Sequence, residues 1–472
     1  MTAPTPTNPT PTNPTPTAAT VTVPTAPAPT RADALPEHTI VVDLGYGDAG
    51  KGTVVDHLCR SRDVHTVVRF NGGAQAAHNV VTPGGRHHTF AQFGSGTLAP
   101  GRHGRGVRTH LSRFMLVDLL ALTAEAAWLR TALGVPDPLG GLTVDRRALL
   151  TTPYHAAANR LRETARGGAR HGSCGMGVGE TAEYALRHPD DAPTVGDCAS
   201  PTRLRAVLTR LRDRLTADLG LRVPPGPPPG EVADAYRAIG ARLTLTGDDH
   251  LRRLLRQGRV VFEGAQGVLL DEWHGFHPYT TWSTTTFDNA ETLLAEAGAD
   301  ARPALRLGVL RSYTTRHGPG PLVTEDRRLT VPEPHNGSGA WQGGFRLGHF
   351  DAVAHRYALA ACGGADALAL THLDAPARHP SLGLCESYQL DGATLTDLPT
   401  AVPGDLARQA RLTERLLRAR PGRIRTLPAD PAAWTEAVAD TLRTPVLLES
   451  HGPRSGDKLL HHHAAPTRQL LA

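Results

Sequence analysis

Lysine is almost absent from this sequence of 472 residues, where only Lys51 and Lys458 occur and arginine supplies the other basic side chains. Arginine therefore serves almost everywhere, and a lysine kept in a glycine-rich loop indicates a need for a compact ammonium group. Aromatic residues make up only 5% of the chain. No run approaches the roughly 18 apolar residues of a membrane span, which excludes an integral membrane protein.

Other absences bear on the partners and the compartment. The five cysteines have no CxxC spacing, which argues against a disulfide framework and against a structural zinc site. The 50 basic and 45 acidic residues are too balanced to indicate nucleic-acid binding. The first residues do not form a basic segment followed by an apolar one, so we expect a cytoplasmic protein.

The chain divides into a tail and one large domain. Residues 1–36 are a repeating Thr/Pro/Ala tract with almost nothing apolar to bury, and we expect them to be disordered. In residues 37–472, β-branched runs alternate with helical patterns, which predicts an α/β fold with a largely parallel central sheet. The expected strands are 38–43, 259–263, 305–310, 367–370 and 445–448, and the expected helices are 111–133, 144–166, 202–219, 231–256, 350–361 and 404–419. Helices between about 110 and 256 are expected to form an insertion.

The first expected strand runs into a glycine-rich loop at residues 44–53, which reads LGYGDAGKGT. Glycines let backbone N–H groups approach a phosphate, the helix that follows favours anions at its N-terminus, and Lys51 adds a positive charge. The loop is P-loop-like without being a Walker A motif, because Lys51-Gly52 precedes Thr53. Asp48 would repel a phosphate unless it holds Mg²⁺ or acts as a base. A tight strand-to-helix turn with an incidental lysine is the alternative interpretation.

Further blocks follow in order along the chain, and together they resemble the adenylosuccinate synthetase family. GYGDAGKG is similar to the family's GDEGKGK loop, and residues 67–78, VVRFNGGAQAAH, resemble its VVRxxGGxNAGH segment. Residues 262–271, FEGAQGVLLD, and 313–321, YTTRHGPGP, resemble its two most specific blocks. Residues 172–179, 371–374 (THLD) and 450–453 (SHGP) resemble shorter turns of the family.

The resemblance implies a homodimeric enzyme that uses GTP to replace the 6-oxygen of a purine nucleotide such as IMP by an amine, with aspartate as the default amine. Catalytic roles would fall to Asp48, His78, Lys51 and Gln266. GTP would be bound by Gly47, Gly50, Lys51, Gly52, Thr53, Thr371, Asp374, Ser450, Gly452 and Pro453. Among these, Asp374 would accept hydrogen bonds from N1 and N2 of guanine. The purine nucleotide would be bound by Gln75, Ser173, Cys174, Arg187, Gln266 and Thr281. Mg²⁺ would be bound by Asp48 and the backbone carbonyl of Ala77.

The largest departure from the family is the loop that would bind the amine. The family reads GATTGRRRRTGWLD there, whereas this chain reads NGSGAWQGGFRLGHFD at residues 336–351. Only Arg346 remains of the arginine run that clamps the carboxylates of aspartate, and each carboxylate normally needs a guanidinium fork. Either Ser338 and backbone amides take over, or the amine is not aspartate. The alternatives are thus a paralogue that uses another amine or a modified purine nucleotide, and a weakly active regulatory paralogue that binds nucleotide.

Overall fold

The structure is a computed structural model that describes residues 36–101, 104, 106–298, 304–337 and 339–461. The Thr/Pro-rich segment expected to be disordered lies outside these residues, apart from Pro36. Across the described part of the chain, no helix is long and apolar enough to cross a membrane.

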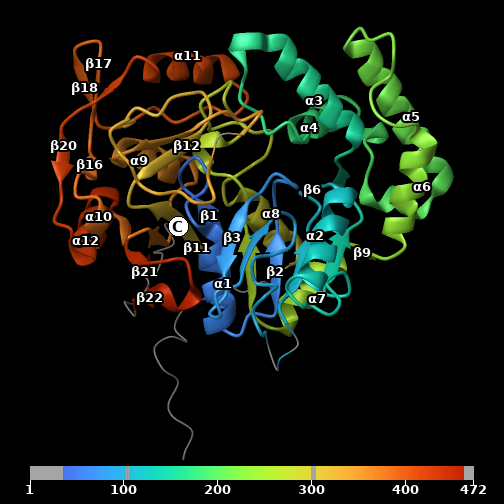
Figure 1. Cartoon of the computed structure of the whole chain (residues 1–472), viewed down its shortest axis with the longest axis horizontal. Helices are drawn as coiled ribbons and strands as arrows, with labels where there is room; N and C mark the ends of the chain where they lie inside the picture. Colours follow the sequence, from blue (N-terminus) through green and yellow to red (C-terminus); the bar gives the residue numbers. More distant parts are fainter. Residues whose placement is uncertain (1–35, 102–103, 105, 299–303, 338, 462–472) are drawn as a thin grey trace, which may run out of the picture. The chain divides into compact units, whose positions relative to one another are not determined.

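Among the described residues, ten strands form one sheet in the order β22-β21-β15-β11-β1-β10-β2-β5-β7-β9. All neighbouring strands are parallel except the pair β21 and β22, which confirms the expected α/β fold (Figure 1). The strands are β1 (His38–Asp43), β2 (Thr66–Arg69), β5 (Arg108–Leu111), β7 (Leu142–Asp145), β9 (Thr244–Thr246), β10 (Val260–Glu263), β11 (Ala304–Arg311), β15 (Ala367–Thr371), β21 (Val446–Ser450) and β22 (Lys458–Leu460).

Strand β1 lies in the interior of the sheet, where both of its faces are buried. Its β-branched run pairs with β10 on one side and with β11 on the other, as is typical of a strand covered by helices on both faces. Val41 packs with Val54 and Leu58 of helix α1 (Lys51–Ser61) on one face. Ile40 and Val42 face the opposite core, which contains α9 (Ala352–Ala361) and α12 (Pro431–Leu442).

The expected helical insertion contains several helices that share a separate apolar cluster. These are α2 (Leu119–Thr131), α3 (Pro153–Arg166), α5 (Pro201–Asp218) and α6 (Pro229–Gly240), and α5 and α6 lie side by side in Figure 1. Helix α3 begins with a capping box, in which Thr152 and His155 satisfy each other's backbone N–H groups and Pro153 takes the first helical position.

Three expected helices were wrong in their bounds. The segment 111–133 contains β6 (Leu116–Val117) before α2, whose start is set by Asp118 accepting hydrogen bonds from two N–H groups of its first turn. The segment 144–166 begins with the end of β7 and with β8 (Leu149–Leu150) before α3. The segment 231–256 is split into α6 and α7 (Asp249–Gln257) by β9. In each case, a short strand interrupts a run whose apolar residues also fit a helical period.

The topology brings distant parts of the chain to one edge of the sheet. The glycine-rich loop follows β1, residues 264–267 follow β10, residues 372–374 follow β15, and residues 451–453 follow β21. Because these strands are parallel, their carboxyl ends meet, and this is where open α/β sheets bind ligands.

Candidate active site

The carboxyl ends of the central strands surround a cavity of about 980 Å³. It gathers nearly all the residues that the sequence predicts for the site. Those in its wall are Gly47, Asp48, Gly50, Lys51, Gly52, Thr53, Gln75, Ala77, His78, Ser173, Cys174, Gln266, Thr281, Thr371, Asp374, Ser450, Gly452 and Pro453.

Two of the predicted residues that the structure describes are not found there. Arg187 lies at the end of α4 (Val178–Arg187), where its half-exposed side chain pairs with Glu183 and with Asp218. Arg346 borders a separate pocket, and Ser338 lies outside the described residues.

The glycine-rich loop is held by a buried carboxylate that the sequence did not single out. Asp43, the last residue of β1, accepts hydrogen bonds from the N–H groups of Gly45 at 2.8 Å and Ala49 at 2.9 Å. It also forms an ion pair with Lys51 at 2.9 Å, and the Lys51 ammonium group donates a second hydrogen bond to the carbonyl of Gln266 at 2.6 Å. This buried ammonium has three N–H groups, so one remains for a phosphate at the start of α1.

Asp48, the proposed base, faces a histidine that sequence reasoning missed. The Nε2 atom of His317 lies 3.2 Å from Asp48 Oδ2. Burial favours the neutral form of Asp48, but the His317 hydrogen bond and the nearby Arg311 guanidinium outweigh it and hold the pKa of this carboxyl below its usual range. Asp48 is therefore ionised and can accept a proton. The family block YTTRVG has a valine at the position of His317, and this departure was the available signal.

His78 is oriented by Glu263, the glutamate of the FEGAQG block. His78 Nδ1 lies 2.7 Å from Glu263 Oε1, and Glu263 Oε2 accepts a hydrogen bond from the backbone N–H of Ser95 at 2.9 Å. The Ser95 hydroxyl also donates to this fully buried carboxylate. Despite its burial, the charge and hydrogen bond of His78 lower the pKa of Glu263 to about 2. Burial holds the pKa of His78 itself below its usual range, and the Glu263 charge opposes this shift. A carboxylate on Nδ1 fixes the ring and favours its protonated form, which can donate from Nε2.

Two glutamine side chains in the cavity have buried polar atoms without a partner among the described residues. They are both amide atoms of Gln75 and the Oε1 atom of Gln266. Gln266 has a φ of 61°, a left-handed conformation, and its amide nitrogen donates to the Thr281 hydroxyl. Because leaving a buried polar group unpaired costs about 1–3 kcal/mol, this cluster is typical of a site that binds a polar ligand.

The residues predicted for GTP tie the glycine-rich loop to the ends of β15 and β21. The Thr371 hydroxyl donates to the carbonyl of Ala49 at 2.7 Å, and the Thr53 hydroxyl donates to the carbonyl of Pro453 at 2.7 Å. Burial lowers the pKa of His372 well below its ordinary value, so its ring is neutral. Asp374 also lines the cavity, and its carboxylate accepts a hydrogen bond from Arg378.

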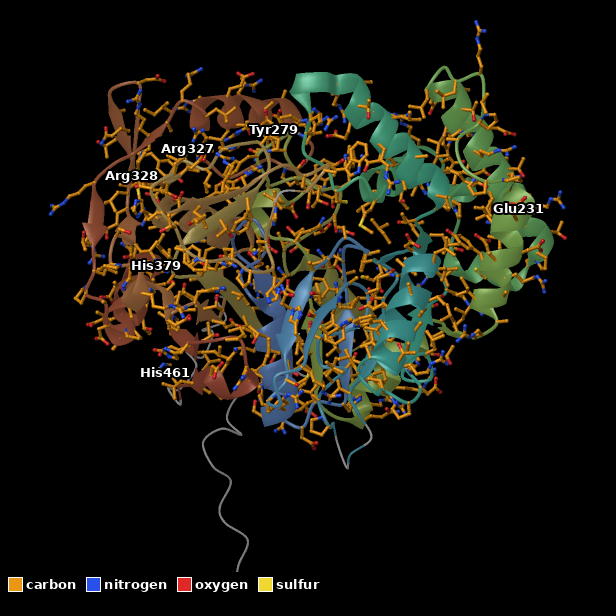
Figure 2. The ribbon with its side chains drawn as sticks, in the orientation of Figure 1. Glu231, Tyr279, Arg327, Arg328, His379 and His461 are labelled. Atoms are coloured by element: carbon orange, nitrogen blue, oxygen red, sulfur yellow. The ribbon has the colours of Figure 1, made fainter. Side chains whose placement is uncertain are left out.

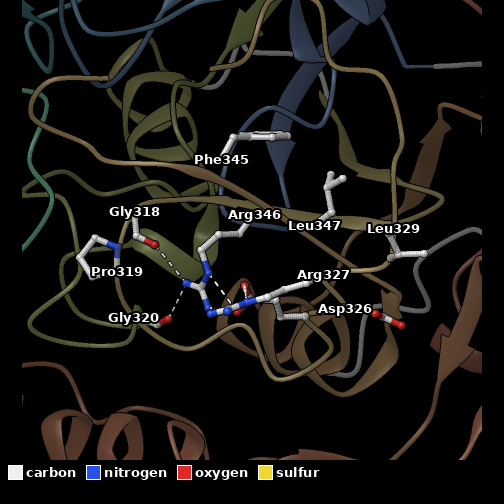
Figure 3. A pocket seen from close by; sticks show the side chains of 10 residues that line it. Gly318, Pro319, Gly320, Asp326, Arg327, Leu329, Phe345, Arg346 and Leu347 are labelled. Atoms are coloured by element: carbon white, nitrogen blue, oxygen red, sulfur yellow. Dashed lines mark hydrogen bonds and ion pairs between the residues drawn. The ribbon is translucent and has the colours of Figure 1, made fainter. Parts of the chain in front are cut away.

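Arg346, predicted to bind the amine, is engaged elsewhere (Figure 3). Its Nη1 donates to the carbonyls of Gly318 at 3.0 Å and Gly320 at 2.8 Å, and its other nitrogens pair with Glu325. These groups border a pocket of about 630 Å³. Arg327, which is labelled in Figure 2, also belongs to this pocket. Its side chain is almost fully exposed. Apart from Arg346, this pocket contains none of the residues that the sequence predicts for the site.

The arginines that do line the large cavity already have partners. Arg162, Arg166, Arg311 and Arg378 pair with carboxylates, and Arg316 donates to the carbonyls of Pro319, Pro321 and Tyr279. The amine loop contributes uncharged side chains such as Asn336 and Gln342 to the cavity.

No group of three or more His, Cys, Asp or Glu side chains that could hold a metal ion occurs within the described ranges. The donor chemistry nevertheless fits Mg²⁺ shared with phosphates, which is commonly bound by one or two carboxylates plus phosphate oxygens. Asp48 and Ala77 both line the cavity beside Lys51.

A parallel sheet with a glycine-rich loop at its carboxyl edge, an ionised carboxylate and a glutamate-bound histidine are typical of a nucleotide-dependent enzyme. The family model for adenylosuccinate synthetase matches residues 40–458. The chain is 32% identical over 450 residues to the adenylosuccinate synthetase of Myxococcus xanthus, covering 90% of this chain and 98% of that protein. It is 30% identical over 447 residues to the adenylosuccinate synthetase of Acidithiobacillus ferrooxidans, covering 90% of this chain and 98% of that protein.

Solved structures agree on the fold. The fully ligated adenylosuccinate synthetase of Plasmodium falciparum superposes with a TM-score of 0.73 at 19% identity, covering 90% of this chain and all of that one. The succinoaminodeoxyadenylate synthetase of cyanophage S-2L, bound to dGMP and dATP, gives a TM-score of 0.55 at 18% identity, covering 92% and 97%. The chain belongs to the adenylosuccinate synthetase family and is a GTP-dependent ligase that forms a C–N bond.

Proposed function

We propose that the protein uses GTP to activate the 6-oxygen of IMP, or of a close analogue, and replaces that oxygen by the amino group of aspartate. The observation that carries this proposal is the convergence of Asp48, Lys51, His78 and Gln266 on one cavity. A regulatory paralogue without activity has no need of an ionised base and a glutamate-bound histidine, and both are present.

In the first step, Asp48 takes the proton from N1 of the 6-oxopurine. The resulting 6-oxyanion attacks the γ-phosphorus of GTP, an O6–P bond forms, and the bond to the bridging oxygen of GDP breaks. His78 donates to the γ-phosphate oxygens and Lys51 offsets the charge on the phosphates. Asp48 and the Ala77 carbonyl would hold Mg²⁺, which neutralises phosphate charge when bound. Gln75, Gln266 and Thr281 would bind the purine nucleotide.

In the second step, the amine attacks C6 and the 6-oxygen leaves as part of inorganic phosphate. The amine loop contributes no arginine to the cavity within the described residues, because its Arg346 pairs with Glu325 and borders the other pocket. We propose that the amides of Asn336 and Gln342 and the backbone N–H groups of the amine loop take this role.

Two further properties are proposed from membership of the family. The protein would act as a homodimer, and it would be found in the cytoplasm. Sedimentation of the full chain would distinguish a dimer from a monomer. Arg187 does not line the cavity of its own chain, so its contacts with the second subunit are the ones to examine in a dimer.

The experiment that tests the proposed function is phosphate release from GTP and Mg²⁺ in the presence of IMP, with and without aspartate. Product is followed by mass, and Asp48→Asn serves as the inactive control. Aspartate-dependent release with a succinyl adduct is expected. Release that depends on IMP but yields no adduct would contradict aspartate as the amine, and absence of release would contradict the proposed reaction.

A further inference from the structure

Asp374, the residue expected to read guanine, has an arginine beside it in the cavity. Both Asp374 and Arg378 belong to the cavity wall, together with His372 and Pro453. Arg378 ends the four-residue helix α10 (Ala375–Arg378), and its Nη2 donates to Asp374 Oδ2. The guanidinium is held at the cavity by the same carboxylate that is expected to bind the base.

The pair leaves hydrogen-bonding capacity on both members. In the described part of the chain, the Asp374 carboxylate forms its hydrogen bond through Oδ2, and Oδ1 is left to accept from a ligand. Arg378 has five N–H groups and uses one nitrogen for Asp374. Its side chain is 66% exposed, against 30% for Asp374, so a base that reaches Asp374 can also reach the guanidinium.

The chemistry of this pair matches one edge of guanine. Guanine carries two neighbouring donors, N1–H and N2–H₂, and the acceptor O6 on the other side of N1. A carboxylate accepts from the two donors, and a guanidinium is the side chain that most often donates to O6. Adenine presents an acceptor at N1 and an amino group at position 6, so both members of the pair would face a group of the same polarity.

The surrounding groups favour this arrangement. The uncharged ring of His372 lies against Tyr313 in an edge-on contact, with ring centres 5.7 Å apart, and it offers a flat surface for a base. Lys458 donates to the carbonyls of Gly452 at 2.7 Å and Arg454 at 2.9 Å and is not among the residues that line the cavity. Arg378 does line it, and is therefore a cation beside Asp374 that a ligand in the cavity can reach.

We propose that Arg378 is a specificity-determining residue that donates to O6 of the guanine base while Asp374 accepts from N1 and N2. This inference rests on the proposed function only in assigning a guanine nucleotide to this end of the cavity. If the pair merely stabilised α10, as an exposed ion pair spaced by four residues can, its removal would not change the preference between bases.

The test is equilibrium binding of GDP, IDP and ADP to the full chain by calorimetry, which needs no turnover. Arg378→Ala is compared with the wild-type protein and with Arg425→Ala. Arg425 forms a similarly exposed ion pair with Glu386 at 3.1 Å and is not part of the cavity, so its variant controls for loss of a surface pair. Arg378→Lys, which keeps the charge and a donor, is the conservative variant.

Arg378→Ala is expected to weaken the binding of GDP and of IDP about tenfold alike, because both bases carry O6, and not to weaken the binding of ADP. Tenfold is the effect of one charge-assisted hydrogen bond, about 1.4 kcal/mol. The affinity of Arg378→Lys for GDP should lie between those of the wild type and Arg378→Ala. Arg425→Ala should bind GDP as tightly as the wild type does. Unchanged GDP binding in Arg378→Ala would overturn the proposal. Equal losses for GDP and ADP, or a wild-type protein that does not prefer GDP to ADP, would also overturn it.

The outcome is separable from that of the proposed reaction. If the wild-type protein binds GDP with the expected dependence on Arg378 but releases no phosphate with IMP, the proposed function fails and the specificity role stands. If phosphate release is normal and the preference does not depend on Arg378, only the specificity role fails.

Discussion

Replacing Glu263 by glutamine should slow the reaction and destabilise the protein, and the structure gives the size of the second effect. The fully buried carboxylate accepts from His78 and from both polar groups of Ser95. Lowering its pKa from the ordinary value of 4.5 to about 2 corresponds to about 3 kcal/mol of folding free energy, at about 1.4 kcal/mol per tenfold change in proton affinity.

The sign of the pH dependence follows from the direction of that pKa. A depressed glutamate pKa contributes stability above its unfolded value, near 4.5, and this contribution is lost as the pH falls toward 2. Wild type and Glu263→Gln should therefore differ by about 3 kcal/mol at neutral pH. Their urea denaturation midpoints should converge as the pH falls below about 5.

The effect on catalysis is measured as phosphate release under saturating GTP and IMP. The variant removes the negative charge of Glu263 beside His78 Nδ1. Because this charge favours the protonated form of His78, kcat should fall by at least about tenfold. Glu125→Gln is the matched control, since Glu125 is a buried carboxylate that accepts from the N–H groups of Ala91 at 2.9 Å and Gln92 at 2.8 Å. A normal kcat in Glu263→Gln, or an equal loss in Glu125→Gln, would refute the reasoning.

Three further variants test other parts of the site. Asp48→Asn should lower phosphate release at least about 100-fold, the usual contribution of a general base, while calorimetry still detects GDP binding; an active variant would contradict its role. Arg346→Ala should destabilise the protein by about 1–3 kcal/mol, because Glu325 and two carbonyls lose the guanidinium that they bind, and should leave the KM for aspartate unchanged; a large rise in that KM would return Arg346 to the amine site. His317→Val removes the hydrogen bond that lowers the pKa of Asp48, so the acidic limb of kcat against pH should move to higher pH; a limb that stays in place would show that His317 does not support the base.

The sequence predicted the phosphate loop and most of the cavity because these residues occur in short contiguous blocks. Each block follows a strand, and the parallel order brings the strand ends together, so the residues of GYGDAGKG, FEGAQG and THLD meet without further information. The class of fold followed from the same alternation of strands and helices. The bounds of the helices near residues 111–166 did not, because short strands there share their apolar pattern with helices.

The partners of these residues could not be predicted, since they depend on distances between segments remote in the sequence. The sequence pattern indicates only that Asp43 ends a strand. The ion pair between its carboxylate and Lys51 depends on the folded path of the glycine-rich loop. Arg346 illustrates the converse. Its place in the amine loop suggested a substrate ligand, but β13 (Phe345–Gly348) pairs antiparallel with β12 (Thr314–His317), and its guanidinium is engaged by Glu325 and by two carbonyls of the turn after β12.

The most direct test of the central claim is the fate of the 6-oxygen. IMP labelled with oxygen-18 at position 6 is incubated with the protein, GTP, Mg²⁺ and aspartate, and the inorganic phosphate is analysed by mass. If Asp48 creates a 6-oxyanion that attacks GTP, each molecule of phosphate released with product carries the label. Unlabelled phosphate would mean that water attacks GTP, and would contradict the assignment of this cavity to 6-phosphoryl transfer.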